Sequence, residues 1–209
     1  MIIHSLRVKG RRALFSRPEF SVEFVTYDVM TPSAAVGILE SIYWKPEMKW
    51  IVDFIHVLNP IKTDTIMGNY VTSKISVKKA LGGKDCHIDA TENREQRNAV
   101  ILKDVDYVIK AHINVLSGDH PEKHDIIFKR RAESGQNYRH PYFGQRDFSV
   151  DMFELVKDIP SSHLKDKQDL GIMLYGLNWD KKCAPMFFHA VMENGIIAVP
   201  QPGSKEILQ

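Results

Sequence analysis

One stretch of helical spacing, set between stretches of strand spacing, constrains the fold of this chain most. In residues 31–44, "TPSAAVGILESIYW", apolar residues recur at i, i+3, i+4 and i+7, which predicts a helix with one buried face. Thr31 is a good N-cap and Pro32 fits the first helical position. We expect the helix to end near Trp44, before Pro46.

Strand spacing recurs on both sides of this helix. The extended segments that it predicts are residues 2–10, 20–29, 49–58, 61–75 and 103–116. A short helix over 73–81 and a long polar loop over 82–98 separate the last two. The order strand, helix, strand, strand, helix, strand is that of the ferredoxin-like (RRM-like, split βαβ) fold, with one extra extended stretch before the first helix.

The chain is therefore predicted to have an α+β fold in two parts. Residues 1–117 form the ferredoxin-like N-terminal domain. Residues 118–209 form a smaller C-terminal part, a helix followed by antiparallel β-structure with a hairpin turned at Asn194-Gly195.

Charge and cysteine content narrow the class of protein. The 28 basic and 26 acidic residues leave a net charge of +2, so total charge does not indicate a nucleic-acid partner, although residues 1–18 carry five basic residues before the first acid, Glu19. Two isolated cysteines suggest neither a disulfide framework nor a cysteine zinc site. Without a signal core or an apolar stretch of membrane length, we expect a cytoplasmic protein with no membrane partner.

Several common chemistries lack their motifs in this sequence. The nine histidines form no HExxH, and Pro121 separates His120 from His124, the one pair with ligand spacing. Phosphate-binding GxxxxGK[ST] and GxGxxG loops and the GxSxG elbow of serine hydrolases are also absent. We therefore expect neither a metal nor a cofactor.

Cleavage of RNA needs neither group, because the ribose 2′-hydroxyl can attack the adjacent phosphate if the protein supplies a base, an acid and positive charge. In "SGDHPEKHDIIFKRR", residues 117–131, His124 falls in the first turn after Pro121, where the helix dipole favours a bound anion and a neutral imidazole. The alternative is a solvated Lys123–His124 pair on a charged helix. Tyr43 likewise has an ordinary explanation, as a packing tyrosine at a helix end.

Taken together, the motifs resemble a known family. "VKGRRALFSRPEF", "YDVMTPSAAVGILESIYWKP", "EQRNAVIL", "EKHDIIFKRR", "HPYFGQRDF", "LGIMLYGLNW" and "GIIAVP" are similar, in this order, to the CRISPR-associated RAMP-type endoribonucleases of subtype I-C. The resemblance implies a metal-independent endonuclease that cuts CRISPR repeat RNA at the base of its hairpin by 2′-hydroxyl attack. It further implies that the enzyme stays on the crRNA 5′ handle, with the other subunits of the type I-C interference complex.

The resemblance also implies a catalytic set. The catalytic tyrosine of the family falls on Tyr43, in the "IYWKP" block, and its adjacent lysine and histidine fall on Lys123 and His124. Tyr43 or His124 would act as the base and Lys123 would stabilise the developing negative charge; which of the two is acid and which base stays open.

Basic residues are the candidates for RNA contacts, since phosphate contacts favour Arg and Lys. The candidates are Arg7, Lys9, Arg11, Arg12, Arg17, Arg130, Arg131, Arg139 and Arg146. We expect about half of them to be ordinary surface charges instead.

Two other functions remain open on the sequence. One is a non-catalytic subunit that caps the crRNA 5′ handle while another enzyme cuts, and the other is a purely structural scaffold. Whether duplex DNA is a further partner is also open.

Overall fold

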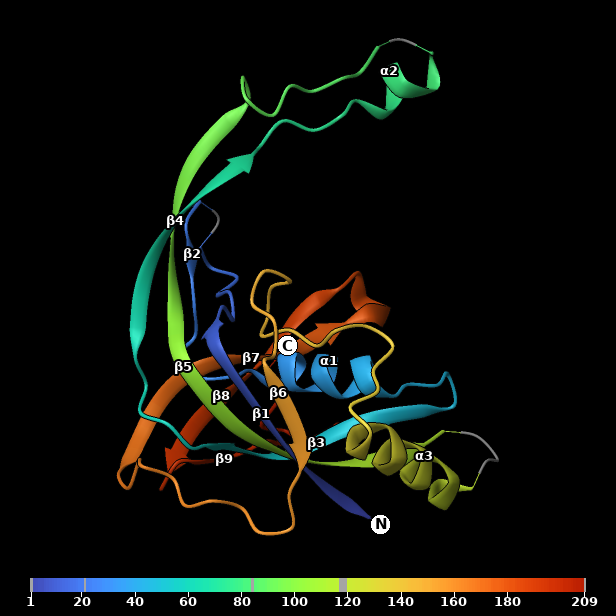
Figure 1. Ribbon diagram of the computed structural model, residues 1–209, viewed down its shortest axis with the longest axis vertical. Helices are drawn as coiled ribbons and strands as arrows, with labels where there is room; N and C mark the ends of the chain where they lie inside the picture. The colour runs from blue at the N-terminus through green and yellow to red at the C-terminus, as the bar shows by residue number, and fades with distance from the viewer. Residues whose placement is uncertain (1, 21, 84, 117–119, 209) are drawn as a thin grey trace.

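The computed structural model describes residues 2–20, 22–83, 85–116 and 120–208. Its elements are β1 (Ile3–Ala13), β2 (Phe24–Val25), α1 (Pro32–Ile42), β3 (Met48–Val57), β4 (Thr63–Val71), α2 (Val77–Leu81), β5 (Arg94–Val115), α3 (Pro121–Glu133), β6 (Met152–Leu155), β7 (Lys167–Asn178), the 3-10 turn η1 (Trp179–Lys181), β8 (Ala184–Glu193) and β9 (Ile196–Ala198). In this described part the strands form one sheet of order β6-β1-β5-β3-β9-β8-β7, with β2 and β4 also paired to β5 (Figure 1). The α+β class is confirmed.

The centre of the sheet is β5, which runs antiparallel to β1 on one side and to β3 on the other. β6 adds to the free edge of β1, also antiparallel. The prediction had taken residues 61–75 as the third strand of the domain and 73–81 as its second helix. The structure instead places β5 between β1 and β3, while β4 and α2 belong to an arm that projects from the sheet (Figure 1).

The structure differs from the prediction at the boundaries of two segments. Residues 82–98 were expected to be a loop, but β5 begins at Arg94 because residues 94–98 pair with the outer part of β4. The hydrogen bonds to β4 make this segment a strand, although its polar sequence does not show a strand pattern. In the described part of the predicted extended stretch over 20–29, the structure has the two-residue β2, which pairs with Ala99 and Val100, and an isolated bridge from Thr26 to Ser16.

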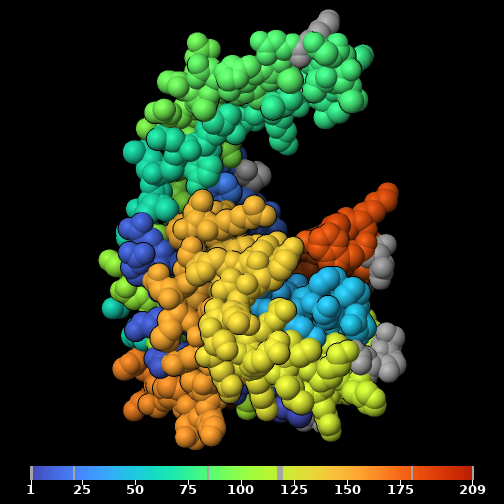
Figure 2. All heavy atoms as spheres, turned by 45° about the vertical axis from the view of Figure 1, so that its right-hand side comes forward, coloured from blue at the N-terminus to red at the C-terminus, as the bar shows by residue number. Residues whose placement is uncertain are grey.

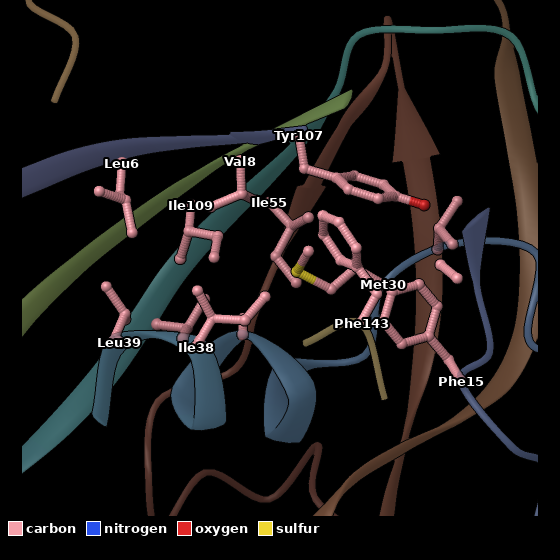
Figure 3. Packing of buried hydrophobic residues seen from close by; sticks show 14 of the residues in the cluster. Leu6, Val8, Phe15, Met30, Ile38, Leu39, Ile55, Tyr107, Ile109 and Phe143 are labelled. Carbon is pink, nitrogen blue, oxygen red and sulfur yellow. The ribbon is translucent and has the colours of Figure 1, made fainter. Parts of the chain in front are cut away.

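The first helix agrees with the prediction. The Thr31 side chain accepts a hydrogen bond from the Ala34 amide, and the stripe Ala35, Ile38, Leu39 and Ile42 is buried. This stripe packs against the sheet, where Ile38 and Leu39 face Leu6, Val8 and Ile109 (Figure 3). Helix α1 ends at Ile42 because Tyr43 takes an extended backbone, although its amide still donates to the Leu39 carbonyl.

The C-terminal part is antiparallel, as predicted. The turn at Asn194 and Gly195, both with positive φ, joins β8 to β9, which confirms the predicted hairpin. The predicted domain boundary at 117/118 falls in residues 117–119, outside the described residues, and remains a prediction. Among the described residues no helix has the length and apolar character to cross a bilayer, and the cytoplasmic location stays a prediction.

Glycine is required where the segment after α3 meets the end of β1. Gly144 has φ +80°, and a Cβ built on it would lie 2.0 Å from the Leu14 carbonyl oxygen. Gly144→Ala should therefore lower the free energy of unfolding by at least about 2 kcal/mol.

Gly37→Ala is the matched control, since a Cβ there meets nothing within 4 Å and alanine favours the helix. It should stabilise the protein by about 1 kcal/mol. Urea denaturation measures both variants, and equal stabilities for the two would contradict the assigned backbone geometry.

Candidate active site

Tyr43 and His124 meet where the end of α1 faces the first turn of α3. The Tyr43 hydroxyl lies 2.9 Å from His124 Nδ1, although the two residues are 81 positions apart in the sequence. Both are closed to solvent, with exposures of 1% for Tyr43 and 0% for His124. A phenol hydrogen-bonded to an imidazole can pass a proton in either direction, depending on the tautomer of the ring.

Contacts from Trp50 and Arg131 hold Tyr43 and the end of α1 in place. Its carbonyl accepts a hydrogen bond from the Trp50 indole N–H at 2.9 Å. Arg131 on α3 donates to the Ile42 carbonyl at 3.0 Å, and its guanidinium lies 5.3 Å from the centre of the Tyr43 ring. Arg131 is thus partly buried against the end of α1, and it ties this end to α3.

The residue next to His124 anchors the other side of the site. Asp125 is bonded to His4 on β1, at 2.5 Å between Oδ1 and Nε2, and both side chains are buried. The His4 ring also packs edge-on against Phe128 of α3 and Trp50 of β3. The His4–Asp125 pair therefore fixes the first turn of α3, and with it His124, against the sheet.

Sequence reasoning missed this pair, although one signal pointed to it. His4 is in phase with Leu6 and Val8 in the alternation of the first strand, which places it on the buried face. A buried imidazole needs a polar partner, and Asp125 is the buried carboxylate that supplies it.

Lys123 lies on the other side of the same helical turn. Its side chain is exposed, whereas His124 and Asp125 point inward. Of the three predicted catalytic residues, the structure brings Tyr43 and His124 into contact and leaves Lys123 at the adjacent surface.

The predicted RNA-binding residues divide into bonded and outward-facing groups. Arg7 makes a two-pronged pair with the buried Asp106, and this carboxylate raises the pKa of the guanidinium. Arg17 lies over the Tyr27 ring and near Glu19 and Asp28. The outward-facing residues are Lys9, Arg11, Arg12, Arg130, Arg139 and Arg146.

Arg11 and Arg12 line one surface depression of about 490 Å³ together with Lys103. Asp147 and Asp151 line it too, and Asp151 lies 3.5 Å from Arg11. In the described parts of the chain no three His, Cys, Asp or Glu side chains form a group that could hold a metal ion.

Comparison with known proteins gives one consistent family. Residues 5–200 match the Cas_Cas5d family, described as CRISPR-associated protein (Cas_Cas5). A curated relative from Mannheimia succiniciproducens, "CRISPR pre-crRNA endoribonuclease Cas5d", is 40% identical over 97% of this chain and 96% of its own length. A protein with the same name from Thermus thermophilus is 33% identical over 97% of this chain and 93% of its own length.

Solved structures agree with the fold. A crystal structure of a CRISPR-associated protein superposes with a TM-score of 0.74 and 25% identity, covering 100% of this chain and 97% of the other. A functionally uncharacterized protein, SMU1763c from Streptococcus mutans, superposes with a TM-score of 0.72 and 24% identity over the same shares, which shows the fold alone.

The buried His4–Asp125 pair predicts a pH dependence of stability. Burial lowers the pKa of His4 below its ordinary value of 6.5, and the bond to Asp125 opposes this only in part. Because the unfolded chain binds the proton more readily, the stabilising effect is complete above about pH 6.5 and is lost as the pH falls through the lower pKa of the folded state.

His4→Gln keeps an N–H donor for Asp125 but does not titrate. Its unfolding free energy should fall less between about pH 7.5 and pH 5 than that of the wild type. The variant should keep some pH dependence because burial lowers the pKa of His56 as well. Urea denaturation at both pH values measures this, with the surface variant His87→Gln as control; equal slopes for all three proteins would refute the assignment.

Proposed function

The chain belongs to the Cas5d family of CRISPR-associated proteins, and from that premise we propose that it is an endoribonuclease that processes CRISPR repeat RNA through the Tyr43–His124 pair. The observation that carries the proposal is the 2.9 Å contact between these residues at the meeting of two helices. The curated relatives match this chain over nearly their full length and are named pre-crRNA endoribonucleases, which supports repeat RNA as the substrate.

We assign the RNA-binding scaffold to a ferredoxin-like core. In chain order its elements are β1, α1, β3, β5, α3 and β6, and their sheet order is β6-β1-β5-β3. This is the split βαβ arrangement with β5 as its third strand and α3 as its second helix. On this assignment both helices that carry the proposed catalytic residues lie in the core of the domain.

Cleavage proceeds by attack of the ribose 2′-hydroxyl on its own 3′-phosphate. One member of the pair takes the proton of the 2′-hydroxyl while the P–O bond to the 5′-oxygen breaks, and the other protonates the leaving oxygen. The products are a 2′,3′-cyclic phosphate and a 5′-hydroxyl. Lys123, at the surface beside His124, stabilises the extra negative charge of the phosphorane.

The pair must open for this reaction, since Tyr43 and His124 are both closed to solvent. Rotation of the Tyr43 and His124 side chains would break the contact and present both groups beside Lys123. Such a change on substrate binding is a common gating step in enzymes. The burial also favours the second candidate, a non-catalytic subunit that only holds the crRNA 5′ handle, in which the pair would be structural.

RNA would approach over the outward-facing basic residues. Arg130 lies on α3, and Lys9, Arg11 and Arg12 lie on β1, where a phosphate can displace the weak surface partner of Arg11, Asp151. Arg7 and Arg131 are better explained as structural residues than as RNA contacts, because both donate hydrogen bonds to buried protein groups. After cleavage the protein would remain on the 5′ handle within the interference complex. A duplex DNA contact is left open.

The mechanism predicts the requirements of the reaction. Purified protein in EDTA should cut repeat RNA once and leave a 5′ fragment with a cyclic phosphate, because the nucleophile belongs to the RNA. A 2′-deoxy nucleotide before the scissile phosphate should abolish cutting without weakening binding. Gel analysis of the products tests both points, and cleavage of the deoxy substrate or loss of activity in EDTA would rule the mechanism out.

The pair also predicts how substitutions act. Tyr43→Phe and His124→Ala should each slow single-turnover cleavage by about 10²- to 10⁴-fold. Lys123→Ala should slow it by about 10²-fold. All three should change the dissociation constant of uncleavable repeat RNA by less than about threefold, because they act in the transition state.

Lys129→Ala, another exposed lysine of α3, is the control for charge and should leave the cleavage rate close to that of the wild type. Wild-type rates in Tyr43→Phe and His124→Ala would show that this pair is not catalytic, whereas a wild-type protein that binds repeat RNA without cutting it would favour the binding-only function.

A further inference from the structure

All three tryptophans of the chain line one surface groove, which has no part in the reaction described above. The groove has a volume of about 550 Å³ and runs between α1, β3 and the end of the β7–β8 hairpin. Trp50 forms its buried floor, whereas Trp44 and Trp179 are 51% and 76% exposed. Helix α1 and the projecting end of β7 and β8 lie side by side on the face seen in Figure 2.

The shape of the hairpin end keeps Trp179 in solvent. Trp179 begins the short turn η1, and Lys182 and Cys183 follow with φ of +54° and +60°. Two successive non-glycine residues in this left-handed region are uncommon, and their backbone is strained. An exposed indole on a strained turn contributes little to the stability of the fold, which indicates that this surface binds a ligand.

Charged residues of both signs surround the groove: Lys49 and Glu40 line it, and Glu47 lies between the lining residues Pro46 and Met48. An exposed lysine stands next to each tryptophan in the chain or in its turn: Lys45 follows Trp44, Lys49 precedes Trp50, and Lys182 closes the turn of Trp179. Among the described residues of the lining, Glu40 is the acidic one. Burial raises the pKa of Glu40, so its negative charge is disfavoured there. Aromatic faces interleaved with lysines are the usual platform for unpaired nucleotides.

The groove lies next to the end of α1 that carries Tyr43. Trp44 is joined to Tyr43 by a peptide bond, and the Trp50 indole donates to the Tyr43 carbonyl. A strand of RNA whose scissile phosphate lies at Lys123 would need to pass this end of α1. A partner protein would find the apolar walls equally suitable, but it would gain nothing from a lysine beside every indole.

We propose that this groove binds unpaired nucleotides of the RNA next to the scissile phosphate, with bases stacked on Trp44 and Trp179 and phosphates against Lys45, Lys49 and Lys182. This proposal rests on the proposed function, because the single strand that the groove would bind is part of the same RNA substrate. It adds a positioning role for Trp179, which lies on a different element from the catalytic pair.

Tryptophan fluorescence tests the site directly, since every indole of the chain lies in the groove. The probe is a single-stranded oligoribonucleotide of about ten nucleotides, within the usual site size for such platforms. It should quench the emission of the wild type, whereas a blunt RNA duplex of the same length should not.

Trp179→Ala should weaken binding of the single strand by about tenfold, the loss expected for one stacked base, and Trp179→Phe should restore most of it. Phe20→Ala removes an exposed aromatic outside the groove and should bind as the wild type does. Wild-type affinity in Trp179→Ala, or equal quenching by the duplex, would overturn the proposal and leave the groove to a partner protein.

The same titration separates this proposal from the proposed function. His124→Ala should still be quenched by the single strand even though it does not cut. If the wild type is quenched but cuts no repeat RNA, the proposed function fails and the groove stands. If it cuts normally while Trp179→Ala binds and cuts as the wild type does, the groove assignment fails alone.

Discussion

The hydrogen bond between Tyr43 and His124 is the interaction on which the arrangement of this molecule depends most. It joins the residue that follows one helix to the first turn of another, and both partners are fully buried. Each side has its own anchor: Trp50 and Arg131 hold the end of α1, and the His4–Asp125 pair holds α3 against β1. A buried polar contact of this kind persists only when its surroundings over-determine it.

The proposed chemistry follows from this closed arrangement. The proton-transferring groups lie inside, while positive charge and exposed aromatic surface lie outside at the same end of α1. Binding of RNA to the outer surface can therefore be coupled to opening of the inner pair, which would restrict cutting to a correctly seated substrate. The anchors around the pair hold the backbone on both sides, so this motion would be confined to the two side chains.

Local patterns predicted those parts of the structure that depend on local interactions. The sequence was enough to predict the cap and apolar stripe of α1, the alternation of β1 and β3, and the Asn194-Gly195 turn. The order of the sheet could not be predicted in this way, because β4 and β5 both have strand patterns and their pairing decides which of them lies beside β1. No periodicity joins Tyr43 to His124; the resemblance to a family suggested that pair. His4 was readable by its phase, but the tryptophan groove combines three distant elements and had no sequence signal.

The most direct test of the Tyr43–His124 unit is a double-mutant cycle on single-turnover cleavage of repeat RNA. Two groups that act together in one proton-transfer system are strongly non-additive. The double variant Tyr43→Phe, His124→Ala should be no slower than the slower of the two single variants. If the two losses multiply, or if neither variant slows the reaction, the residues do not act as one catalytic unit and the account is wrong.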